Sequence, residues 1–305
     1  MGAYGWTDLP TSVQATLASL GTSGGGEDTF FPVAGGYTGG VIGLFDDEIF
    51  IKAVPVGDPA SHDYLTEARV SAELGRIIPT PPLRLVNQSD GWVVLAFDVA
   101  RGGHANEPWE RQQLQLVLDV LDQIEDTLTP SPVDQLPTAT ERMKGRCSTW
   151  ERLHENRAHG SLTRASLSSW ERANLERLAD LESRAEPLLV GTTLLHFDLR
   201  YDNLFIDGGA VTFVDWGRAC IGPGWMDVVC LLLESRVAEP DLNGLFLSTE
   251  RGALANPESV DAFLTILASY WRYSATLATS GSPGLQARRQ RSSEATVRWL
   301  SARWR

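Results

Sequence analysis

Short runs of hydrophobic residues alternate with polar turns over roughly the first 100 positions, and this pattern predicts a sheet. The runs FFPV, VIGLF and IFIKAV are rich in β-branched and aromatic residues, and glycine-rich or acidic turns separate them. Two further runs flank a polar turn at residues 89–91. Between the third and fourth runs, residues 61–74 place Leu65, Ala68 and Ala72 on one helical face. We therefore expect five strands, with one helix after the third.

Helical spacing replaces this pattern in the rest of the chain. Residues 109–126 repeat apolar residues with a period near 3.6, which is typical of an amphipathic helix. Further helices are predicted near 139–156, 166–188, 225–237, 257–278 and 285–304. Residues 194–216 differ, because short apolar strands there flank a hairpin turn at Asp207-Gly208-Gly209.

These patterns predict three parts and an α+β fold class. Residues 1–29 form an N-terminal helix and connector, residues 30–103 a five-stranded antiparallel sheet lobe with one helix, and residues 104–305 a mostly helical lobe. The 43% hydrophobic and 21% charged content is that of an ordinary globular protein. Apolar runs are far shorter than the ~20 residues that cross a bilayer, and no basic leader is visible at the start. We expect a cytoplasmic protein.

Charge and cysteine content exclude several kinds of partner. With 26 basic and 39 acidic residues the formal charge is −13, which argues against nucleic acids and anionic membranes. Cys147, Cys220 and Cys230 show no Cys-x-x-Cys spacing, so neither a disulfide framework nor a zinc site is indicated. Lys52 and Lys144 are the two lysines of the chain. A chain with so few lysines has reason to keep one where a compact point charge is required.

Residues 196–203, HFDLRYDN, carry the pattern with the clearest chemistry, and VDW follows at 214–216. Phosphoryl transfer needs a carboxylate that orients the attacking hydroxyl and accepts its proton, and Asp198 can do this. It also needs oxygen ligands for Mg²⁺, which Asn203 and Asp215 can supply. The alternative interpretation is an ordinary polar loop between a helix and a strand.

This segment resembles the catalytic core of the aminoglycoside phosphotransferase and choline kinase families, which are small-molecule relatives of protein kinases. Downstream, GPGWMD at 222–227 resembles the stretch that opens the next helix in these families, where the residue matching Asp227 supports the catalytic loop through hydrogen bonds. The resemblance implies a bilobal protein-kinase-like fold. It also implies that the sheet lobe binds ATP or GTP with Mg²⁺ and that the helical lobe binds a hydroxylated small molecule.

The sheet lobe offers an independent check of the resemblance. A kinase-like lobe carries a lysine on its third strand, where the ammonium group pairs with the phosphates and a glutamate on the next helix orients it. Lys52 lies in IFIKAV, and Glu67 is the best partner, with Glu73 as runner-up.

Two further stretches match the nucleotide-binding parts of these kinases. AGGYTGG occupies the place of the phosphate-covering loop, in which Gly36, Thr38 and Gly39 match a G-G-x-S-N turn in part. Residues 97–102 match the hinge between the lobes, where we expect the carbonyl group of Asp98 and the amide of Ala100 to contact adenine.

The resemblance implies an ATP-dependent transfer of the γ-phosphoryl group to a small-molecule hydroxyl. An aminoglycoside-like antibiotic or an amino sugar is the expected acceptor, with antibiotic resistance as the consequence. Residues that could contact it are Arg200, Tyr201, Asp202, Glu234, Trp271 and Tyr273. Two alternatives stay open: a nucleotide-binding pseudokinase without transferase activity, and a kinase of choline or another primary metabolite. A protein kinase is disfavoured, because VDWG replaces D-F-G and no A-P-E segment follows.

Overall fold

The computed structural model describes residues 4–21, 29–33, 40–75, 77–105, 108–235, 241–277 and 283–305, which belong to two compact units. The first unit comprises Met1–Ala105, Pro132–Asp134 and Tyr201–Ala219, and the second comprises Asn106–Ser131, Gln135–Arg200 and Cys220–Arg305. The first segment of this first unit ends at Ala105, two residues beyond the predicted end of the sheet lobe at residue 103. The segment with Asn203 and Asp215 packs with the first unit, although a long helical stretch precedes it.

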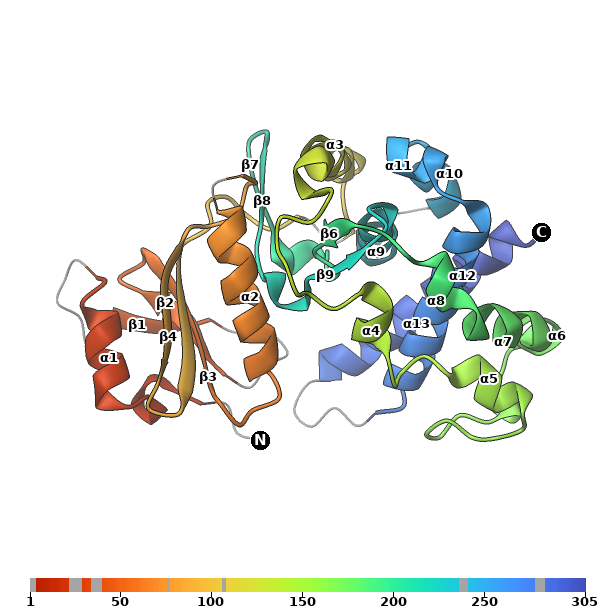
Figure 1. Cartoon of the computed structure of the whole chain (residues 1–305), viewed down its shortest axis with the longest axis horizontal. Helices are drawn as coiled ribbons and strands as arrows, with labels where there is room; N and C mark the ends of the chain where they lie inside the picture. The colour runs from red at the N-terminus through yellow and green to blue at the C-terminus, as the bar shows by residue number, and fades with distance from the viewer. Residues whose placement is uncertain are drawn as a thin grey trace. The chain divides into compact units, whose positions relative to one another are not determined.

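A five-stranded antiparallel sheet dominates the first unit (Figure 1). The strands are β1 (Phe30–Pro32), β2 (Val41–Phe45), β3 (Ile49–Pro55), β4 (Leu83–Ser89) and β5 (Trp92–Asp98), in the order β1-β2-β3-β5-β4. Helix α1 (Thr11–Ala18) covers one face, and α2 (Ser61–Leu74) covers the other. The predicted fold class is confirmed, and α2 begins and ends at the residues that the sequence pattern indicates.

Alternation along β3 decides which side chains meet each helix. Ile49, Ile51 and Ala53 pack with the core on the α1 face. Val54 packs instead with the core on the α2 face. Lys52 is two residues before Val54, so its side chain lies on the same face of the sheet and is directed toward α2.

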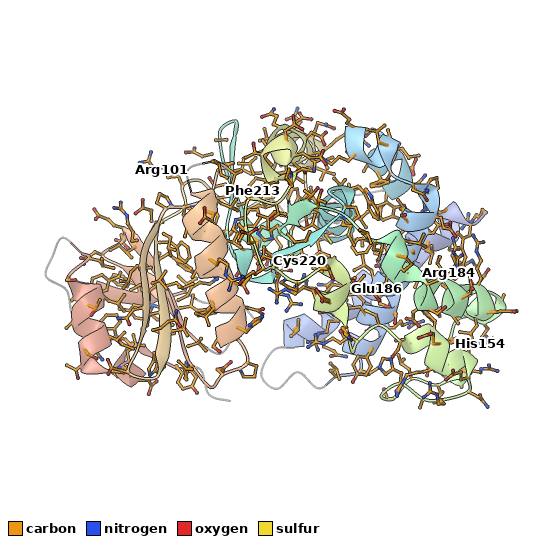
Figure 2. The ribbon with its side chains drawn as sticks, viewed as in Figure 1. Arg101, His154, Arg184, Glu186, Phe213 and Cys220 are labelled. Atoms are coloured by element: carbon orange, nitrogen blue, oxygen red, sulfur yellow. The ribbon has the colours of Figure 1, made fainter. Side chains whose placement is uncertain are left out.

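A hairpin completes the first unit. Strands β7 (Leu204–Asp207) and β8 (Ala210–Phe213) pair with Leu204 opposite Phe213, and the turn lies where it was predicted. The hairpin is tied to the chain after β5, since the amide of Gly103 donates to the carbonyl oxygen of Ile206 at 3.1 Å. Phe213 is fully buried (Figure 2). The 3-10 turns η4 (Tyr201–Asn203) and η5 (Trp216–Arg218) flank the two strands.

Helices form most of the second unit (Figure 1). They are α3 (Arg111–Leu128), α4 (Ala139–Met143), α5 (Thr149–His154), α6 (Ser169–Ala173), α7 (Leu175–Ser183), α8 (Ala185–Leu188), α9 (Trp225–Ser235), α10 (Leu242–Leu247), α11 (Glu250–Leu254), α12 (Pro257–Ser274) and α13 (Pro283–Arg303). A short sheet pairs β6 (Thr193–Leu195) with β9 (Cys220–Gly222). Cys220 is buried, whereas His154 and Arg184 lie at the surface (Figure 2).

Two helices expected from the sequence are broken into shorter ones. The stretch 139–156 is interrupted after α4, where Gly145 adopts a left-handed conformation with φ of 84° that ends a helix. The stretch 166–188 is divided among α6, α7 and α8. Helices α10 and α11 were not predicted, because each is too short to show a clear period. Within the described ranges, no helix combines the length and the apolar character that a membrane span requires.

Candidate active site

The buried ammonium group of Lys52 lies between two carboxylates of the first unit. Its Nζ atom is 2.7 Å from Oε2 of Glu67 and 2.8 Å from Oδ1 of Asp215. Strand β3 presents the lysine, α2 supplies Glu67, and the chain after β8 supplies Asp215. The predicted ion pair with Glu67 is therefore present, whereas Glu73 is exposed. We call Lys52, Glu67 and Asp215 the ammonium cluster.

Burial and pairing shift the pKa values of the ammonium cluster in a consistent way. Burial alone would lower the pKa of Lys52, but the neighbouring charges of Asp215 and Glu67 outweigh it and raise the pKa above its usual range. Burial raises the pKa of Glu67 to about 7, although Lys52 acts in the opposite direction. Lys52 therefore stays charged at physiological pH, whereas Glu67 titrates near neutrality.

The hairpin register brings Asn203 and Asp215 to the same end of the β7–β8 pair. Because Leu204 lies opposite Phe213, the next residues outward are Asn203 and Val214, and the amide of Val214 donates to the carbonyl oxygen of Asn203 at 3.0 Å. Asp215 follows in a left-handed conformation with φ of 66° and ψ of 58°, which aspartate adopts more readily than most residues. The Asn203 side chain is buried, while that of Asp215 is 37% exposed.

The donor atoms at this end of the hairpin suit a magnesium ion. One carboxylate and one carboxamide are hard oxygen donors, and Mg²⁺ usually takes one or two protein ligands together with waters and substrate phosphates. Within the described ranges, no group of three or more His, Cys, Asp or Glu side chains could hold a metal ion. Two oxygen donors of this kind suit a metal ion that phosphates and waters also bind.

Asp198 lies in the second unit, on a loop that α9 holds in place. Oδ2 of Asp227 accepts the amide hydrogen of His196 at 2.7 Å, and Oδ1 accepts that of Phe197 at 2.9 Å. Phe197 has φ of 63°, a strained conformation for a bulky residue that these bonds help to maintain. The amide of Asp198 in turn donates to Nδ1 of His196 at 3.3 Å. The hydrogen bonds expected from Asp227 are therefore present, and burial raises the pKa of its carboxyl group.

Guanidinium groups surround the Asp198 carboxylate, whose side chain is 27% exposed. Nε of Arg200 is 3.4 Å from Oδ2, and Nη2 of Arg288 is 3.6 Å from Oδ1. Nε of Arg288 also lies 3.0 Å from Oε2 of Glu234. Sequence analysis missed Arg288, because it belongs to α13, a helix that carries no motif. We call Arg288, Asp198 and Glu234 the guanidinium cluster.

Comparison with known protein families shows the family to which the chain belongs. The model of the phosphotransferase enzyme family (APH) matches residues 51–263, well over half of the chain. The chain belongs to the phosphotransferase enzyme family. The match spans both the ammonium cluster and the 196–203 motif, and it confirms the predicted family relationship and the prediction of an enzyme. A search of curated proteins finds no match for this phosphotransferase.

Solved structures show the fold that the phosphotransferase shares. Choline kinase LicA from Streptococcus pneumoniae is 14% identical, with 95% of this chain and 98% of that chain covered and a TM-score of 0.60. A choline/ethanolamine kinase family protein from Mesorhizobium loti is 15% identical, with 97% and 98% covered and a TM-score of 0.63. Aminoglycoside phosphotransferase APH(3'')-Id from Streptomyces rimosus, in complex with ADP and streptomycin, is 16% identical, with 94% and 99% covered and a TM-score of 0.51.

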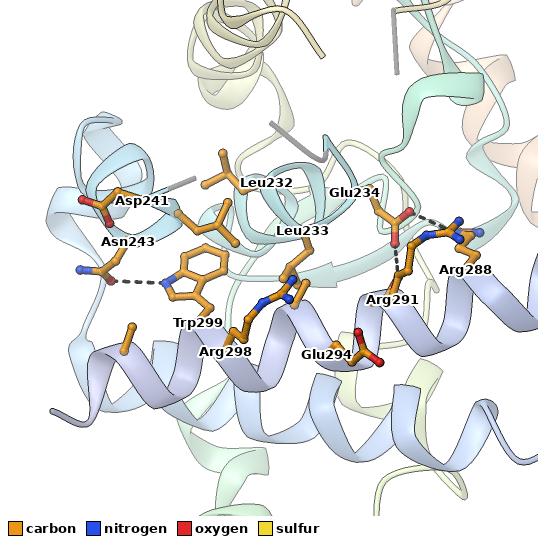
Figure 3. Close-up of a pocket in the computed structure, with 14 residues that line it drawn as sticks. Leu232, Leu233, Glu234, Asp241, Asn243, Arg288, Arg291, Glu294, Arg298 and Trp299 are labelled. Atoms are coloured by element: carbon orange, nitrogen blue, oxygen red, sulfur yellow. Dashed lines mark hydrogen bonds and ion pairs between the residues drawn. The ribbon is translucent and has the colours of Figure 1, made fainter. Parts of the chain in front are cut away.

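The second unit of the phosphotransferase contains a cavity of about 700 Å³ along α13 (Figure 3). Figure 3 shows Glu234 and Arg288 toward one end and Asp241, Asn243 and Trp299 toward the other. The remaining lining residues are Leu232, Leu233, Leu242, Arg291, Ser292, Glu294, Ala295, Arg298 and Ala302. Six of the fourteen described lining residues are apolar, and the three acidic side chains among the others are matched by three arginines.

The predicted acceptor contacts lie in different places. Glu234 lines this cavity. The Trp271 ring centroid is 5.6 Å from Cζ of Arg288. Tyr273 stacks on His159 with ring centroids 3.8 Å apart, so its ring is committed to packing. Arg200 contacts Asp198, and the first unit holds Tyr201 and the half-buried Asp202.

The predicted hinge leaves the sheet at the end of β5. The amide of Asp98 donates to the carbonyl oxygen of Pro82 and that of Val99 to Glu48, while Ala100 follows outside the strand. Gly102 has φ of 90°, and a Cβ atom there would lie 2.3 Å from the carbonyl oxygen of Ile206, so a side chain would clash with the backbone. The loop residues Gly36, Thr38 and Gly39 lie outside the described residues.

Proposed function

We propose that this phosphotransferase moves the γ-phosphoryl group of ATP, bound with Mg²⁺, to a hydroxyl group of a small molecule. The observation that carries the proposal is the ammonium cluster, in which a buried strand lysine is held by a helix glutamate and by the aspartate of the VDW motif. Phosphoryl transfer is achieved mainly by positioning and by neutralising charge on the phosphates. A permanently charged, anchored lysine next to a metal-binding carboxylate suits that task.

Each candidate residue receives a role in this proposal. Lys52 binds phosphate oxygens and Glu67 orients its ammonium group, while Asn203 and Asp215 hold Mg²⁺. The metal, when bound, neutralises charge that develops on the phosphates. Asp198 orients the acceptor hydroxyl and accepts its proton.

Adenine recognition is assigned to the backbone of the hinge. The carbonyl group of Asp98 and the amide of Ala100 contact the base. The kinase-like neighbours support a nucleotide, since the structure from Streptomyces rimosus is a complex with ADP.

The cavity along α13 is our candidate for the acceptor-binding site. Its volume of about 700 Å³ lies in the range that holds drug-sized molecules. Among the described lining residues Trp299 is the one aromatic residue, whereas quaternary ammonium groups such as that of choline are typically bound by several aromatic rings. The cavity therefore favours an antibiotic-sized acceptor, such as an aminoglycoside-like compound or an amino sugar derivative, over choline.

The balanced charge of the cavity narrows the choice among such acceptors. Glu234, Asp241 and Glu294 face an equal number of arginines in the lining. Glu234 is paired with Arg288, and Asp241 caps α10 by accepting the amide hydrogen of Gly244 at 2.9 Å. The size of the cavity suits an aminoglycoside, but a polycation gains no net attraction from such a wall, so antibiotics with few positive charges belong in the screen beside the aminoglycosides.

An acceptor screen tests the proposal. The wild-type protein is incubated with MgATP or MgGTP and a panel of aminoglycosides, amino sugars, nucleoside antibiotics and choline, and mass spectrometry detects the gain of one phosphoryl group. We expect transfer by the wild type and loss of transfer in Asp198→Asn. Binding of MgATP without transfer to any acceptor would favour the pseudokinase alternative.

A further inference from the structure

The last helix of the protein supplies a charged side chain to the loop of Asp198. Arg288 is 8% exposed, and its Nη2 atom lies 3.6 Å from Oδ1 of Asp198. Asp198 and Arg288 are 90 positions apart in the chain, so this contact exists only because α13 packs within the second unit. A buried guanidinium group keeps its charge and must be satisfied by partners that the fold holds in place.

Glu234, which Ser292 in turn binds, and the ring of Trp271 hold Arg288 where it is. Nε lies 3.0 Å from Oε2 of Glu234, whose side chain is 11% exposed, and the other oxygen of that carboxylate accepts the hydroxyl hydrogen of Ser292 at 2.8 Å. The ring of Trp271 lies 5.6 Å from Cζ. Ser292 is one helical turn after Arg288, so α13 and α9 fix the position of the guanidinium group together (Figure 3).

The contact with Asp198 differs from the contact with Glu234 in a way that suits positioning. The pair with Glu234 is short and well buried, which is enough to anchor the arginine. At 3.6 Å the contact with Asp198 is an ion pair that is too long for a good hydrogen bond. It attracts Oδ1 of the carboxylate, while Nε of Arg200 lies 3.4 Å from Oδ2, so the two guanidinium groups orient the carboxylate without a short bond from either of them.

We propose that Arg288 is a positioning residue for the Asp198 carboxylate: Glu234 anchors the guanidinium group, which orients Asp198 and connects it to the cavity along α13. The inference rests on the proposed function, because it assumes that Asp198 is the group that receives the acceptor proton. It goes beyond that function by assigning to α13 a part in the transfer step as well as in forming the cavity.

Arg288→Gln tests the inference, with Arg289→Gln as the matched control on the same helix. Nη1 of Arg289 donates to the carbonyl oxygen of Ser274 at 3.0 Å, so this control also removes a partly buried arginine contact. Misplacing a catalytic group typically costs roughly 10²-fold. We therefore expect kcat to fall ~10–100-fold in Arg288→Gln with an unchanged KM for MgATP, and Glu234→Gln to shift kcat in the same direction by less.

Two further variants keep the test decisive if Arg288→Gln folds poorly. Arg288→Lys retains the charge and should recover part of kcat. Arg288→Ala should regain activity on addition of millimolar guanidinium chloride, whereas Asp198→Asn and Arg289→Gln should show no such rescue. A merely structural role would lower the melting temperature without changing kcat of the folded protein.

The outcomes separate the inference from the proposed function. An active wild type whose kcat is unchanged in Arg288→Gln, or is lowered to the same extent in Arg289→Gln, would overturn the positioning role and leave the transferase intact. Absence of transfer by the wild type to any acceptor would overturn the proposed function, and the positioning role with it.

Discussion

The ammonium cluster and the guanidinium cluster follow the same plan in different parts of the molecule. In each, one buried cation is shared by two carboxylates. In each, one carboxylate is well buried, Glu67 or Glu234, and the other is more exposed, Asp215 at 37% or Asp198 at 27%. The more exposed carboxylate is the one to which we assign contact with the reactants. The buried carboxylate serves to anchor the cation.

The clusters differ in the type of cation and in how closely it is held. The ammonium group of Lys52 lies within 2.8 Å of both carboxylates, whereas the guanidinium group of Arg288 is closer to its anchor than to Asp198. A lysine is a compact point charge on a flexible stem, so it can turn from Asp215 toward phosphate oxygens. An arginine is planar and presents a fixed fork, which suits a group that orients its neighbour and stays in place.

Removing the charge of Asp215 should break the ammonium cluster most completely. Asp215→Asn loses both the proposed ligand for Mg²⁺ and the ion pair with Lys52, so we expect kcat to fall on the order of 10³-fold, measured as ADP release at saturating MgATP. Asp207→Asn, at the exposed turn of the same hairpin, is the control and should keep wild-type kcat. Unchanged kcat in Asp215→Asn with a wild-type melting temperature would refute the proposed role of this residue.

Changing the cation of the ammonium cluster tests whether lysine is required there. Lys52→Arg keeps the charge but places a larger, rigid group at a position that is 6% exposed, so we expect kcat/KM for MgATP to fall roughly 10²-fold. Lys144→Arg is the matched control, because Lys144 is the other lysine of the chain and is exposed. Equal kcat/KM in the two variants would show that either cation suffices at position 52. The proposed difference between a lysine that binds phosphates and an arginine that orients its neighbour would then not hold.

The clusters also differ in how far the sequence could predict them. Strand alternation orients Lys52, a helix of predictable length supplies Glu67, and a two-residue turn returns Asp215 beside Asn203. The family resemblance pointed to these residues, but the ion pair between Lys52 and Asp215, 163 positions apart, was not predicted. The guanidinium cluster depends on how α9 and α13 pack, and although the GPGWMD motif relates α9 to the loop of Asp198, α13 carries no motif that indicates where it packs. The break between α4 and α5 spans residues 144–148 and escaped prediction, although Gly145 within it is a residue type that commonly ends helices.

Loosening the loop that carries Asp198 should affect the guanidinium cluster less severely. In the wild-type protein each oxygen of the Asp227 carboxylate accepts one backbone amide hydrogen. In Asp227→Asn an NH₂ group replaces one of these oxygens, so one backbone amide faces a donor and loses its acceptor. A buried donor left without an acceptor costs ~1–3 kcal/mol. We expect a loss of stability of that size in urea unfolding, and a fall in kcat of about tenfold because the loop holds Asp198 less firmly. A stable variant with wild-type kcat would show that the loop keeps its conformation without Asp227.

The smallest effect concerns the pH dependence of the buried anchor Glu67. Since its pKa is raised to about 7 in the folded protein, the folded state binds the proton more tightly than the unfolded chain does. The resulting stability is fully present below the ordinary glutamate pKa and is lost as the pH rises through 7. Glu67→Gln removes this titration. Between pH 6 and pH 8 the wild type should therefore lose about 1 kcal/mol of unfolding free energy that the variant keeps.

Urea unfolding at several pH values measures this difference, and Glu73→Gln on the same helix is the control with no expected trend. Glu182, whose pKa burial also raises to about 7, is present in all three proteins, so its contribution cancels in the comparison. A difference between Glu67→Gln and wild type that stays constant from pH 6 to pH 8 would mean that Glu67 is ionised throughout. The ammonium cluster would then be anchored by an ion pair over this whole pH range.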